Sequence, residues 1–320
     1  MRKILVTGGA GYIGSHTCKA LAASGYLPVC YDNLSTGHRD FVRWGPLEVG
    51  DLHDTVRLQA VLEQHQPLAV IHFAASAYVG ESIGNPFKYY QNNVGGTLSL
   101  LEAMRRAGPS SIVFSSTCAT YGTPQGATIT EQCPQQPINP YGRSKLMIER
   151  MLADLGACGE LRYMALRYFN AAGADRQREV GERHFPETHL IPLAIGSAGA
   201  GAPLGIFGGD FPTADGTAVR DYIHVEDLAL AHVLAVEHLL DGGASQQINL
   251  GTGRGSSVRE IVTALHRLGI GVRTLEAPRR EGDPACLVAD AAKARTLLGW
   301  QPRYTDIEEI LDTAVAWHAA

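Results

Sequence analysis

The sequence predicts an α/β protein, with a doubly wound parallel sheet and a smaller α/β lobe toward the C-terminus. Three observations support this fold class. Apolar strand-like runs alternate with helical patterns through the first half of the chain. A glycine-rich turn follows the first run, and the alternation gives way to Gly- and Pro-rich stretches after about residue 174. Alternation of this kind builds a parallel sheet that helices cover on both faces.

The elements of the first half follow one another along the chain. Short apolar runs predict strands over residues 3–7, 27–31, 68–73, 111–115 and 162–166. Between them, apolar residues at helical spacing predict helices over residues 13–24, 55–65, 96–107 and 141–155. We therefore expect a first domain over residues 1–174.

The second half is less regular. It contains Gly- and Pro-rich stretches over residues 199–209 and 278–284, and predicted helices over residues 225–240, 258–268, 290–298 and 306–318. Gly299 supplies a stop for the helix before it. We expect a second domain over residues 175–320 that closes over the sheet, with some C-terminal segments packed back onto the first domain. Trp300 and Trp317 are expected in the core or between the lobes.

The glycine-rich turn is the most informative local feature. Gly8, Gly11 and Gly14 lie where the first strand passes into the first helix. Glycine allows a tight turn and lets a pyrophosphate approach the backbone, and the free amides of the helix start face its negative charge. Asp32 ends the second apolar run, where an acid suits the ribose hydroxyls of NAD and repels the 2′-phosphate of NADP. The turn therefore predicts a Rossmann-type sheet that binds NAD.

Several polar or exposed positions follow the predicted strands. In open parallel sheets, ligands bind beyond the carboxyl ends of the strands. This rule places one group of residues around a single crevice, namely Gly11, Asp32, Asp51, Phe73, Ser115 and Asn170.

A tyrosine and a lysine stand four residues apart in a predicted helix. Tyr141 and Lys145 therefore share one helix face. A phenol has an ordinary pKa of about 10, and lowering it by about three units needs ~4 kcal/mol of differential stabilisation. A lysine cation and a positively charged nicotinamide ring both favour the phenolate. The hydroxyls of Ser115 and Thr117, at a strand end, are suited to hold a reacting alcohol. We expect the pair to act as an acid and base on that alcohol.

Composition narrows the function classes and the compartment. The formal net charge of −5 gives no basic field for nucleic acid, and no apolar run reaches the ~20 residues that cross a bilayer. A strand-like run begins within the first residues, so we expect no signal peptide. The six cysteines form no CxxC pair, which favours free thiols in the cytoplasm. His184 and His189, with no partner cysteine, do not predict a metal site.

Beyond these features, the chain resembles the extended short-chain dehydrogenases/reductases nearly end to end, and within them the UDP-glucose 4-epimerases, also called UDP-galactose 4-epimerases. The N-terminal and middle motifs that carry this resemblance are TGGAGYIGSH at residues 7–16, DNLS at 32–35, HFAA at 72–75, VGES at 79–82, YGRSK at 141–145 and LRYFN at 166–170. The C-terminal ones are VRDYIHV at 219–225 and RREGD at 279–283. The C-terminal matches are the more specific, because that lobe selects the substrate.

The resemblance implies a reaction and roles for three residues. Tyr141 would take the proton from the sugar 4-hydroxyl while hydride passes from C4 to NAD, and the resulting 4-keto sugar would turn over and receive hydride on its other face. Lys145 would depress the pKa of the tyrosine and hold the nicotinamide ribose. Thr117 occupies the position of the family's usual serine and keeps a hydroxyl donor and acceptor.

The resemblance also implies binding residues. Besides Tyr141 and Lys145, the NAD-binding pattern falls on Gly8, Gly11, Tyr12, Ile13, Gly14, Asp32, Asn33, Asp51, Leu52, Phe73, Ala74, Asn92 and Tyr168. The UDP-sugar pattern falls on Thr117, Asn170, His189, Leu190, Phe207, Arg220, Tyr222, Arg280, Asp283 and Leu287. The two arginines would clamp the diphosphate bidentately.

Two positions depart from the family pattern. Ala77 stands where the pattern has a lysine near the cofactor phosphates, which bears on how tightly NAD is held. His189 stands where many members carry asparagine.

Family members are commonly homodimers, and here residues 96–107 and 141–155 would supply the interface.

The residues leave one close alternative open. Residues 77–80, 118–121 and 137–140 also resemble UDP-arabinose (UDP-xylose) 4-epimerases, which act on a pentose. The missing hydroxymethyl group changes specificity by only about 1–3 kcal/mol, so dual activity stays open. The intermediate size of Leu287, where bulk governs entry of an N-acetyl group, leaves UDP-N-acetylglucosamine open as well.

More distant alternatives fit the residues less well. A 4,6-dehydratase needs an acid and a base beside Thr117, where Cys118 and Ala119 stand. An NADPH-dependent reductase is disfavoured by Asp32. Non-catalytic NAD-binding relatives typically lose the tyrosine or the lysine, and this chain keeps both.

Overall fold

A computed structural model describes residues 2–124, 126, 128–280 and 282–319. Its centre is a 7-stranded sheet in the order β10-β6-β5-β4-β1-β2-β3, in which every neighbouring pair is parallel. The strands are β1 (Arg2–Thr7), β2 (Tyr26–Asp32), β3 (Leu47–Val49), β4 (Ala69–His72), β5 (Ser111–Ser115), β6 (Arg162–Tyr168) and β10 (Gln246–Leu250). The doubly wound parallel sheet expected from the sequence is confirmed.

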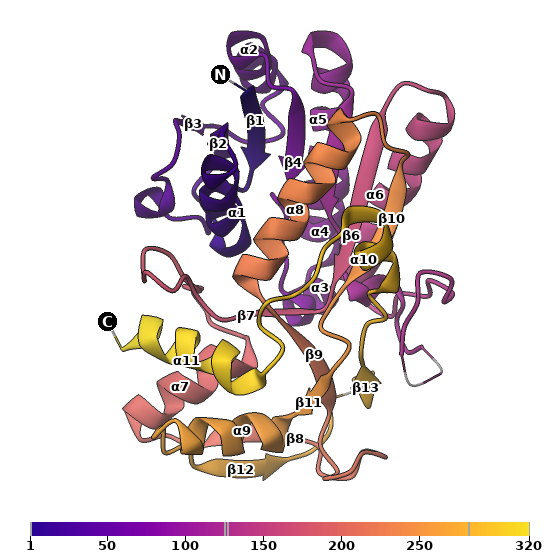
Figure 1. The fold of residues 1–320 in the computed structure, drawn as a ribbon. Coiled ribbons are helices and arrows are strands. Elements are labelled where there is room, and N and C mark those ends of the chain that lie inside the picture. The colour runs from indigo at the N-terminus through magenta and orange to yellow at the C-terminus, as the bar shows by residue number, and fades with distance from the viewer. Residues whose placement is uncertain (1, 125, 127, 281, 320) are drawn as a thin grey trace.

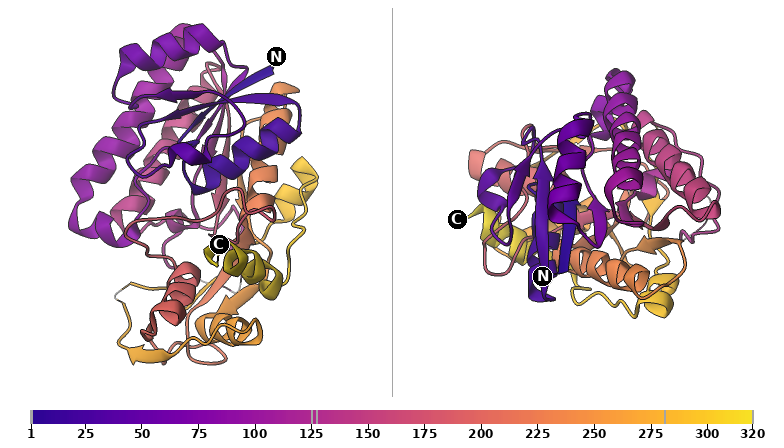
Figure 2. Two further views of the ribbon diagram at one scale, coloured as in Figure 1. Left: turned by 90° about the vertical axis from the view of Figure 1, so that its left-hand side faces the viewer. Right: turned by 90° about the horizontal axis from the view of Figure 1, so that it is seen from above.

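Helices cover both faces of this sheet (Figures 1 and 2). One face carries α2 (Thr55–His65), α5 (Gly96–Ala107) and α6 (Pro140–Ala157), and the other carries α1 (Tyr12–Ala23), α8 (Val225–Leu240) and α10 (Ala292–Leu298). Successive strand residues point to opposite faces. Ile4 and Val6 accordingly pack in the α1/α8 core, whereas Leu5 packs in the α2/α5/α6 core. Burial on both faces explains why the strands read as continuous apolar runs.

Short helical segments complete this part of the chain. They are η1 (Arg39–Phe41), α3 (Val79–Gly84), α4 (Pro86–Tyr89), the π-helical turn η2 (Tyr90–Gly95) and η3 (Cys118–Thr120). η1 lies between β2 and β3, and the others lie between a sheet strand and the helix that follows it, so they shape the loops after the strands.

The second lobe lies below the carboxyl ends of the strands in Figure 1. Its strands are β7 (Asn170–Ala172), β8 (Leu204–Phe207), β9 (Val219–His224), β11 (Gly255–Ser257), β12 (Thr274–Ala277) and β13 (Cys286–Leu287). Its helices are α7 (Leu190–Ala200), α9 (Val258–Arg267) and α11 (Ile307–His318), which share a hydrophobic core. Here β9 pairs with β7, β11 and β13, so one strand organises the lobe.

Three elements from beyond residue 174, one strand and two helices, belong to the first domain. β10 pairs with β6 at the sheet edge, and α8 packs against α1. Trp300, which follows α10, is fully buried in the same core and donates its indole N–H to the backbone oxygen of Asp227 at 2.9 Å. The sequence patterns did not single out β3, which is short, or β10, which begins with two glutamines.

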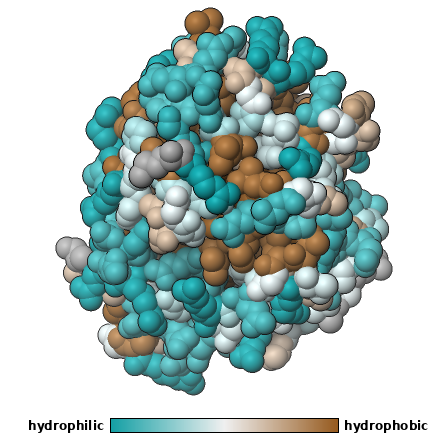
Figure 3. Space-filling model, turned by 45° about the horizontal axis from the view of Figure 1, so that its top comes forward, coloured by the Kyte–Doolittle hydropathy of each residue, from teal (hydrophilic) through white to brown (hydrophobic). Residues whose placement is uncertain are grey.

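The surface mixes polar and apolar side chains. The face shown in Figure 3 carries hydrophobic residues near its centre within a mostly hydrophilic surround. Among the residues that the structure describes, no helix combines the length and the apolar character needed to span a membrane.

Candidate active site

The glycine turn between β1 and α1 forms a backbone cradle. Gly8 has φ +72, and a Cβ there would stand 2.6 Å from the backbone nitrogen of Ala74. A Cβ on Gly14 would stand 2.2 Å from the carbonyl oxygen of Gly8, so the helix and the turn need glycine to pack. Gly11 caps α1 without a side-chain hydrogen bond, which leaves the amides of the first turn, including those of Tyr12 and Ile13, for a phosphate.

Acidic side chains at the ends of β2 and β3 lie beside this cradle. Asp32 is 7% exposed and accepts hydrogen bonds from the backbone N–H of Ala10 (3.0 Å) and of Leu34 (2.8 Å). Burial raises the pKa of this carboxyl. Asp51 accepts a hydrogen bond from Asn33 Nδ2 at 2.7 Å. These fixed carboxylate acceptors next to a phosphate cradle fit the ribose and pyrophosphate of NAD.

Other predicted cofactor residues line the neighbouring strand ends. The backbone N–H groups of Phe73 and Ala74 both donate to the carbonyl of Thr7, at 2.9 and 3.1 Å. Tyr168 and Ser115 share a hydrogen bond of 2.7 Å between their hydroxyls. Three more predicted cofactor residues have fixed contacts. Leu52 packs against Gly96, and Asn92 Nδ2 donates to Asn93 Oδ1 at 3.0 Å. The Tyr12 hydroxyl donates to the Gly173 carbonyl at 2.6 Å.

The expected catalytic residues come together at the end of β5 and the start of α6. Asn139 caps α6 by accepting a hydrogen bond from the N–H of Gly142 at 2.8 Å, and this fixes the first turn, on which Tyr141 stands. Lys145 Nζ donates to the carbonyl of Ser115 at 2.8 Å and lies 5.9 Å from the centre of the Tyr141 ring. Thr117, just after β5, is buried as well.

Burial dominates the protonation of these groups in the protein chain. It raises the pKa of Tyr141 well above its ordinary value, against the hydrogen bond from Thr117, which lowers it. It lowers the pKa of Lys145 to about 7, against the opposing attraction of Glu149. From the sequence, the charges of Lys145 and of the nicotinamide ring are together expected to lower the pKa of Tyr141. In the chain by itself, desolvation of the phenol is the larger effect.

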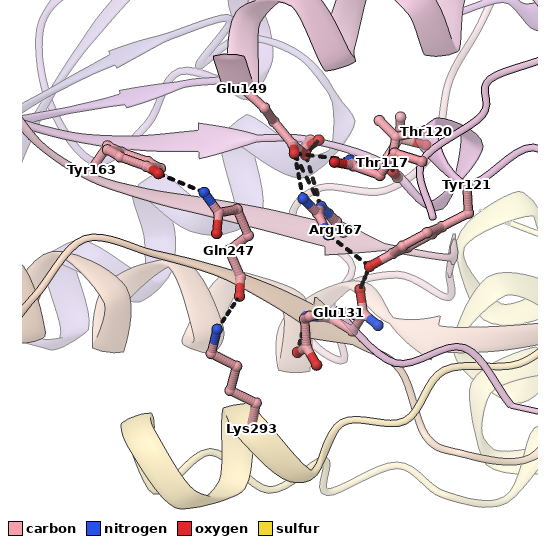
Figure 4. A network of polar contacts seen from close by, with 12 residues as sticks. Thr117, Thr120, Tyr121, Glu131, Glu149, Tyr163, Arg167, Gln247 and Lys293 are labelled. Carbon is pink, nitrogen blue, oxygen red and sulfur yellow. Dashed lines mark hydrogen bonds and ion pairs between the residues drawn. The ribbon is translucent and has the colours of Figure 1, made fainter. Parts of the chain in front are cut away.

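A buried network behind these residues was missed in the sequence (Figure 4). Glu149 stands one turn after Lys145 and accepts hydrogen bonds from Arg167 Nε, at 2.9 and 3.1 Å, and from Ser116 Oγ. Arg167 also donates to the Tyr121 hydroxyl at 2.8 Å, and Tyr121 donates to Asn249 Oδ1 at 2.7 Å. The network joins α6, β6 and β10 to the residue that follows η3. The i, i+4, i+8 spacing of Tyr141, Lys145 and Glu149 is the signal that could have revealed it.

Apart from Thr117, the predicted UDP-sugar residues belong to the second lobe. Asn170 pairs with Tyr222 between β7 and β9, and Arg220 pairs with Leu287 between β9 and β13. The guanidinium of Arg220 forms an ion pair with Asp283. That of Arg280 lies 4.0 Å from the ring centre of Phe207, beside a hollow of about 590 Å³ lined by residues 208–210 and 276–279. Leu190 begins α7.

His189 is the N-cap residue of α7, directly before Leu190, and its side chain joins a cluster with Glu182, His184 and Glu187. Burial alone would raise the pKa of Glu182, but the hydrogen bond from His189 and the charge of His184 outweigh it and lower that pKa to about 2. Burial would lower the pKa of His184, yet Glu182 and Glu187 raise it to about 9. Spacing along the chain did not indicate this cluster, because the loop path brings the glutamates in.

Comparison with known proteins identifies the family. The profile described as "NAD dependent epimerase/dehydratase family" matches residues 4–251. The chain belongs to this family, which agrees with the resemblance carried by its motifs.

Similar proteins match over their full lengths. A UDP-glucose 4-epimerase from Rhizobium leguminosarum bv. trifolii is 56% identical over 99% of this chain and 97% of that protein. The crystal structure of UDP-glucose 4-epimerase from Brucella ovis in complex with NAD is 56% identical, with a TM-score of 0.96 over 99% of this chain and 98% of that one. A UDP-glucose-4-epimerase from Stenotrophomonas maltophila with bound NAD and formylated UDP-arabinopyranose is 40% identical, with a TM-score of 0.96 over 100% and 98% of the two chains.

Proposed function

We propose that this member of the epimerase/dehydratase family is a UDP-glucose 4-epimerase, an isomerase that interconverts UDP-galactose and UDP-glucose. Full-length relatives at 56% identity carry this activity in their names. The observation that carries the proposal in this chain is the buried group of Thr117, Tyr141 and Lys145 beside the glycine cradle. That group can move a proton to and from an alcohol next to a nicotinamide cofactor.

NAD is the cofactor, and the cradle and carboxylates described above fit it. Its pyrophosphate would meet the first-turn amides of α1, and its ribose hydroxyls would meet Asp32. When bound, NAD would supply an acceptor for the hydride of the sugar C4–H bond and would return that hydride to C4. The chain keeps Ala77 where a lysine would give a further phosphate contact.

The proton chemistry falls to the chain's own side chains. Tyr141, as phenolate, accepts the proton of the sugar 4-hydroxyl and gives it back after the sugar has turned over, so the tyrosine ends as it began. Thr117 Oγ1 positions the 4-oxygen by hydrogen bonding. The Lys145 ammonium, held on the Ser115 carbonyl, stabilises the phenolate. Burial keeps water from competing for the same proton.

Substrate binding is assigned to the second lobe. Arg220 and Arg280 bind the diphosphate, Phe207 and Asp283 flank them, and Leu287 faces the sugar. Guanidinium pairs with phosphate oxygens in bidentate fashion, and the two arginines approach from different elements. NAD binding is assigned to residues 1–174 with β10, α8 and α10 added, and the UDP-sugar to the rest of the second half.

We also propose a homodimer in the cytoplasm. Leu98 on α5 and Met147 on α6 expose 58% and 44% of their surface, which suits an interface built from these two helices. All six cysteines lie among the described residues and their thiols are free, as expected in a reducing compartment.

The decisive test is a coupled assay of the purified protein, without added NAD, on UDP-galactose and UDP-arabinopyranose side by side. The proposal expects faster turnover of UDP-galactose. A clear preference for the pentose would identify the chain as a UDP-arabinose 4-epimerase instead. The Stenotrophomonas structure, which holds a formylated UDP-arabinopyranose, is a relative with a bound pentose. No turnover until NAD is supplied would show that NAD is held loosely, as Ala77 suggests. No turnover with NAD present would refute the epimerase assignment.

A further inference from the structure

We propose that Glu182, His184, Glu187 and His189 form a binding site for a divalent metal ion of the zinc class. The four side chains belong to the segment that leads from β7 into α7, and each offers one ligand atom. These atoms all lie within 4.8 Å of one another. The proposal does not depend on which sugar the chain accepts, and three of the four ligands lie outside the positions expected to bind NAD or the UDP-sugar, His189 being the fourth.

The spacing of the ligand atoms suits a small, four-coordinate ion. His184 Nδ1 lies 3.2 Å from Glu182 Oε1 and 3.7 Å from Glu187 Oε2, and His189 Nδ1 lies 3.9 Å from Glu187 Oε1. Zinc bonds to nitrogen and oxygen are about 2.0–2.2 Å long, which sets neighbouring ligand atoms of a tetrahedron roughly 3.3 Å apart. His189 Nδ1 and Glu182 Oε1 are in direct contact and would separate to admit an ion, so rotations of the side chains close the site.

The ring nitrogen of His184 supplies a second, independent observation. His184 Nδ1 is buried, faces two carboxylates and makes no hydrogen bond of acceptable geometry to any residue that the structure describes. Buried polar atoms are normally satisfied, so an unsatisfied one calls for a partner. A cation between the ring and the carboxylates would satisfy Nδ1 of His184 and the oxygens of Glu182 and Glu187 together.

The surroundings hold the ligands in place. Glu187 Oε1 accepts hydrogen bonds from the backbone N–H groups of Thr188 (2.7 Å) and His189 (2.8 Å), which orient its carboxylate. The Glu182 side chain is 5% exposed, and its backbone carbonyl accepts a hydrogen bond from Trp317 Nε1 at 3.0 Å. Such supporting contacts orient metal ligands in known sites.

The donor set selects the class of metal. Two imidazole nitrogens with two carboxylate oxygens suit zinc and its neighbours, whereas calcium and magnesium take oxygen ligands. All four ligands come from the protein, as in structural zinc sites. The ion would therefore fasten the segment before α7 to the C-terminal helix α11 through Glu182 and Trp317, with no part in hydride or proton transfer.

The test titrates Zn²⁺ and Co²⁺ into the chelator-treated holoenzyme. Calorimetry is expected to show one saturable Zn²⁺ site per chain, and Co²⁺ is expected to give the intense visible bands of four-coordinate geometry. The melting temperature should rise with Zn²⁺, because a ligand that binds the folded state stabilises it. Absence of saturable binding, or only the weak bands of six-coordinate Co²⁺, would overturn the proposal.

Matched variants locate the bound metal. Glu187→Gln keeps the shape and the backbone hydrogen bonds of the side chain but removes its charge, and His184→Asn removes the unsatisfied nitrogen. Both are expected to lose the Co²⁺ bands and the Zn²⁺-dependent rise in melting temperature. His53→Asn, at an exposed histidine far along the sequence from the cluster, should keep both. Equal metal binding by all four proteins would place the metal elsewhere and refute the site.

Discussion

The two lobes position their functional side chains by different physical means. In the first lobe, Asp32 and Ser115 end parallel strands and Tyr141 stands in the first turn of a capped helix, so backbone geometry places them. In the second lobe, Arg220 and Arg280 depend on side-chain partners, an ion pair with Asp283 and stacking on Phe207. We infer that substitutions in the first lobe lower the catalytic rate or the free energy of unfolding. Substitutions in the second lobe alter only the affinity for the UDP-sugar.

The largest effect is expected for Tyr141→Phe. The change removes the only proton-transfer group of the tyrosine and keeps its ring, so epimerisation should fall by about 10²–10⁴-fold while bound NAD stays. A steady-state assay with quantification of protein-bound nucleotide measures both. Activity at the wild-type level would refute the role of the tyrosine.

The buried ion pair behind the site comes next. Glu149→Gln leaves the guanidinium of Arg167, which is 4% exposed, without its counter-charge. Breaking a buried pair by removing one partner typically lowers the free energy of unfolding by about 3–5 kcal/mol. Denaturant unfolding should show this loss. Glu102→Gln, which breaks the exposed pair with Arg106, is the control and should cost only about 0.3–0.5 kcal/mol.

The same burial gives Lys145 a measurable pH signature. Its pKa is about 7 in the folded chain, against about 10.4 in an unfolded one. Between these values the unfolded state binds a proton that the folded state does not, so stability rises with pH by up to about 1.4 kcal/mol per unit. The stability difference between wild type and Lys145→Met should therefore shift in favour of wild type from pH 7 to pH 8.5. A difference that stays constant with pH would mean that Lys145 keeps its ordinary pKa.

These cases also separate what a sequence can predict from what it cannot. Gly8, Gly14 and Asp32 were predictable because each is marked by its immediate sequence neighbours, the two glycines by the turn and Asp32 by the end of its strand. The Glu149–Arg167 pair was harder to predict, because helical spacing marks the face of α6 that carries Glu149 but not the partner that β6 brings to it. The effect of burial on the Tyr141 pKa was not predictable for a related reason, since desolvation depends on everything packed around the phenol.

In the second lobe, Arg280→Ala is expected to change binding only. A hydrogen bond to a charged group contributes about 1.5–3 kcal/mol, so the KM for UDP-galactose should rise by roughly 10–150-fold. The side chain is exposed, so the melting temperature should stay close to that of wild type. A large fall in melting temperature with no change in KM would show that the second lobe behaves like the first.

The smallest expected effect concerns the size of the sugar pocket. Leu287 lies in register with Arg220 on the neighbouring strand and is half-buried, and it is the residue proposed above to face the sugar. Leu287→Ser would make room at C2, and relief of a steric limit by a few carbon atoms changes specificity by about 1–3 kcal/mol. The ratio of kcat/KM for UDP-N-acetylglucosamine to that for UDP-glucose should rise about tenfold, with kcat for UDP-glucose unchanged. The proposed proton-transfer group lies in the other lobe. A parallel fall in kcat for both sugars would therefore contradict the assignment of chemistry to the first lobe and of substrate binding to the second.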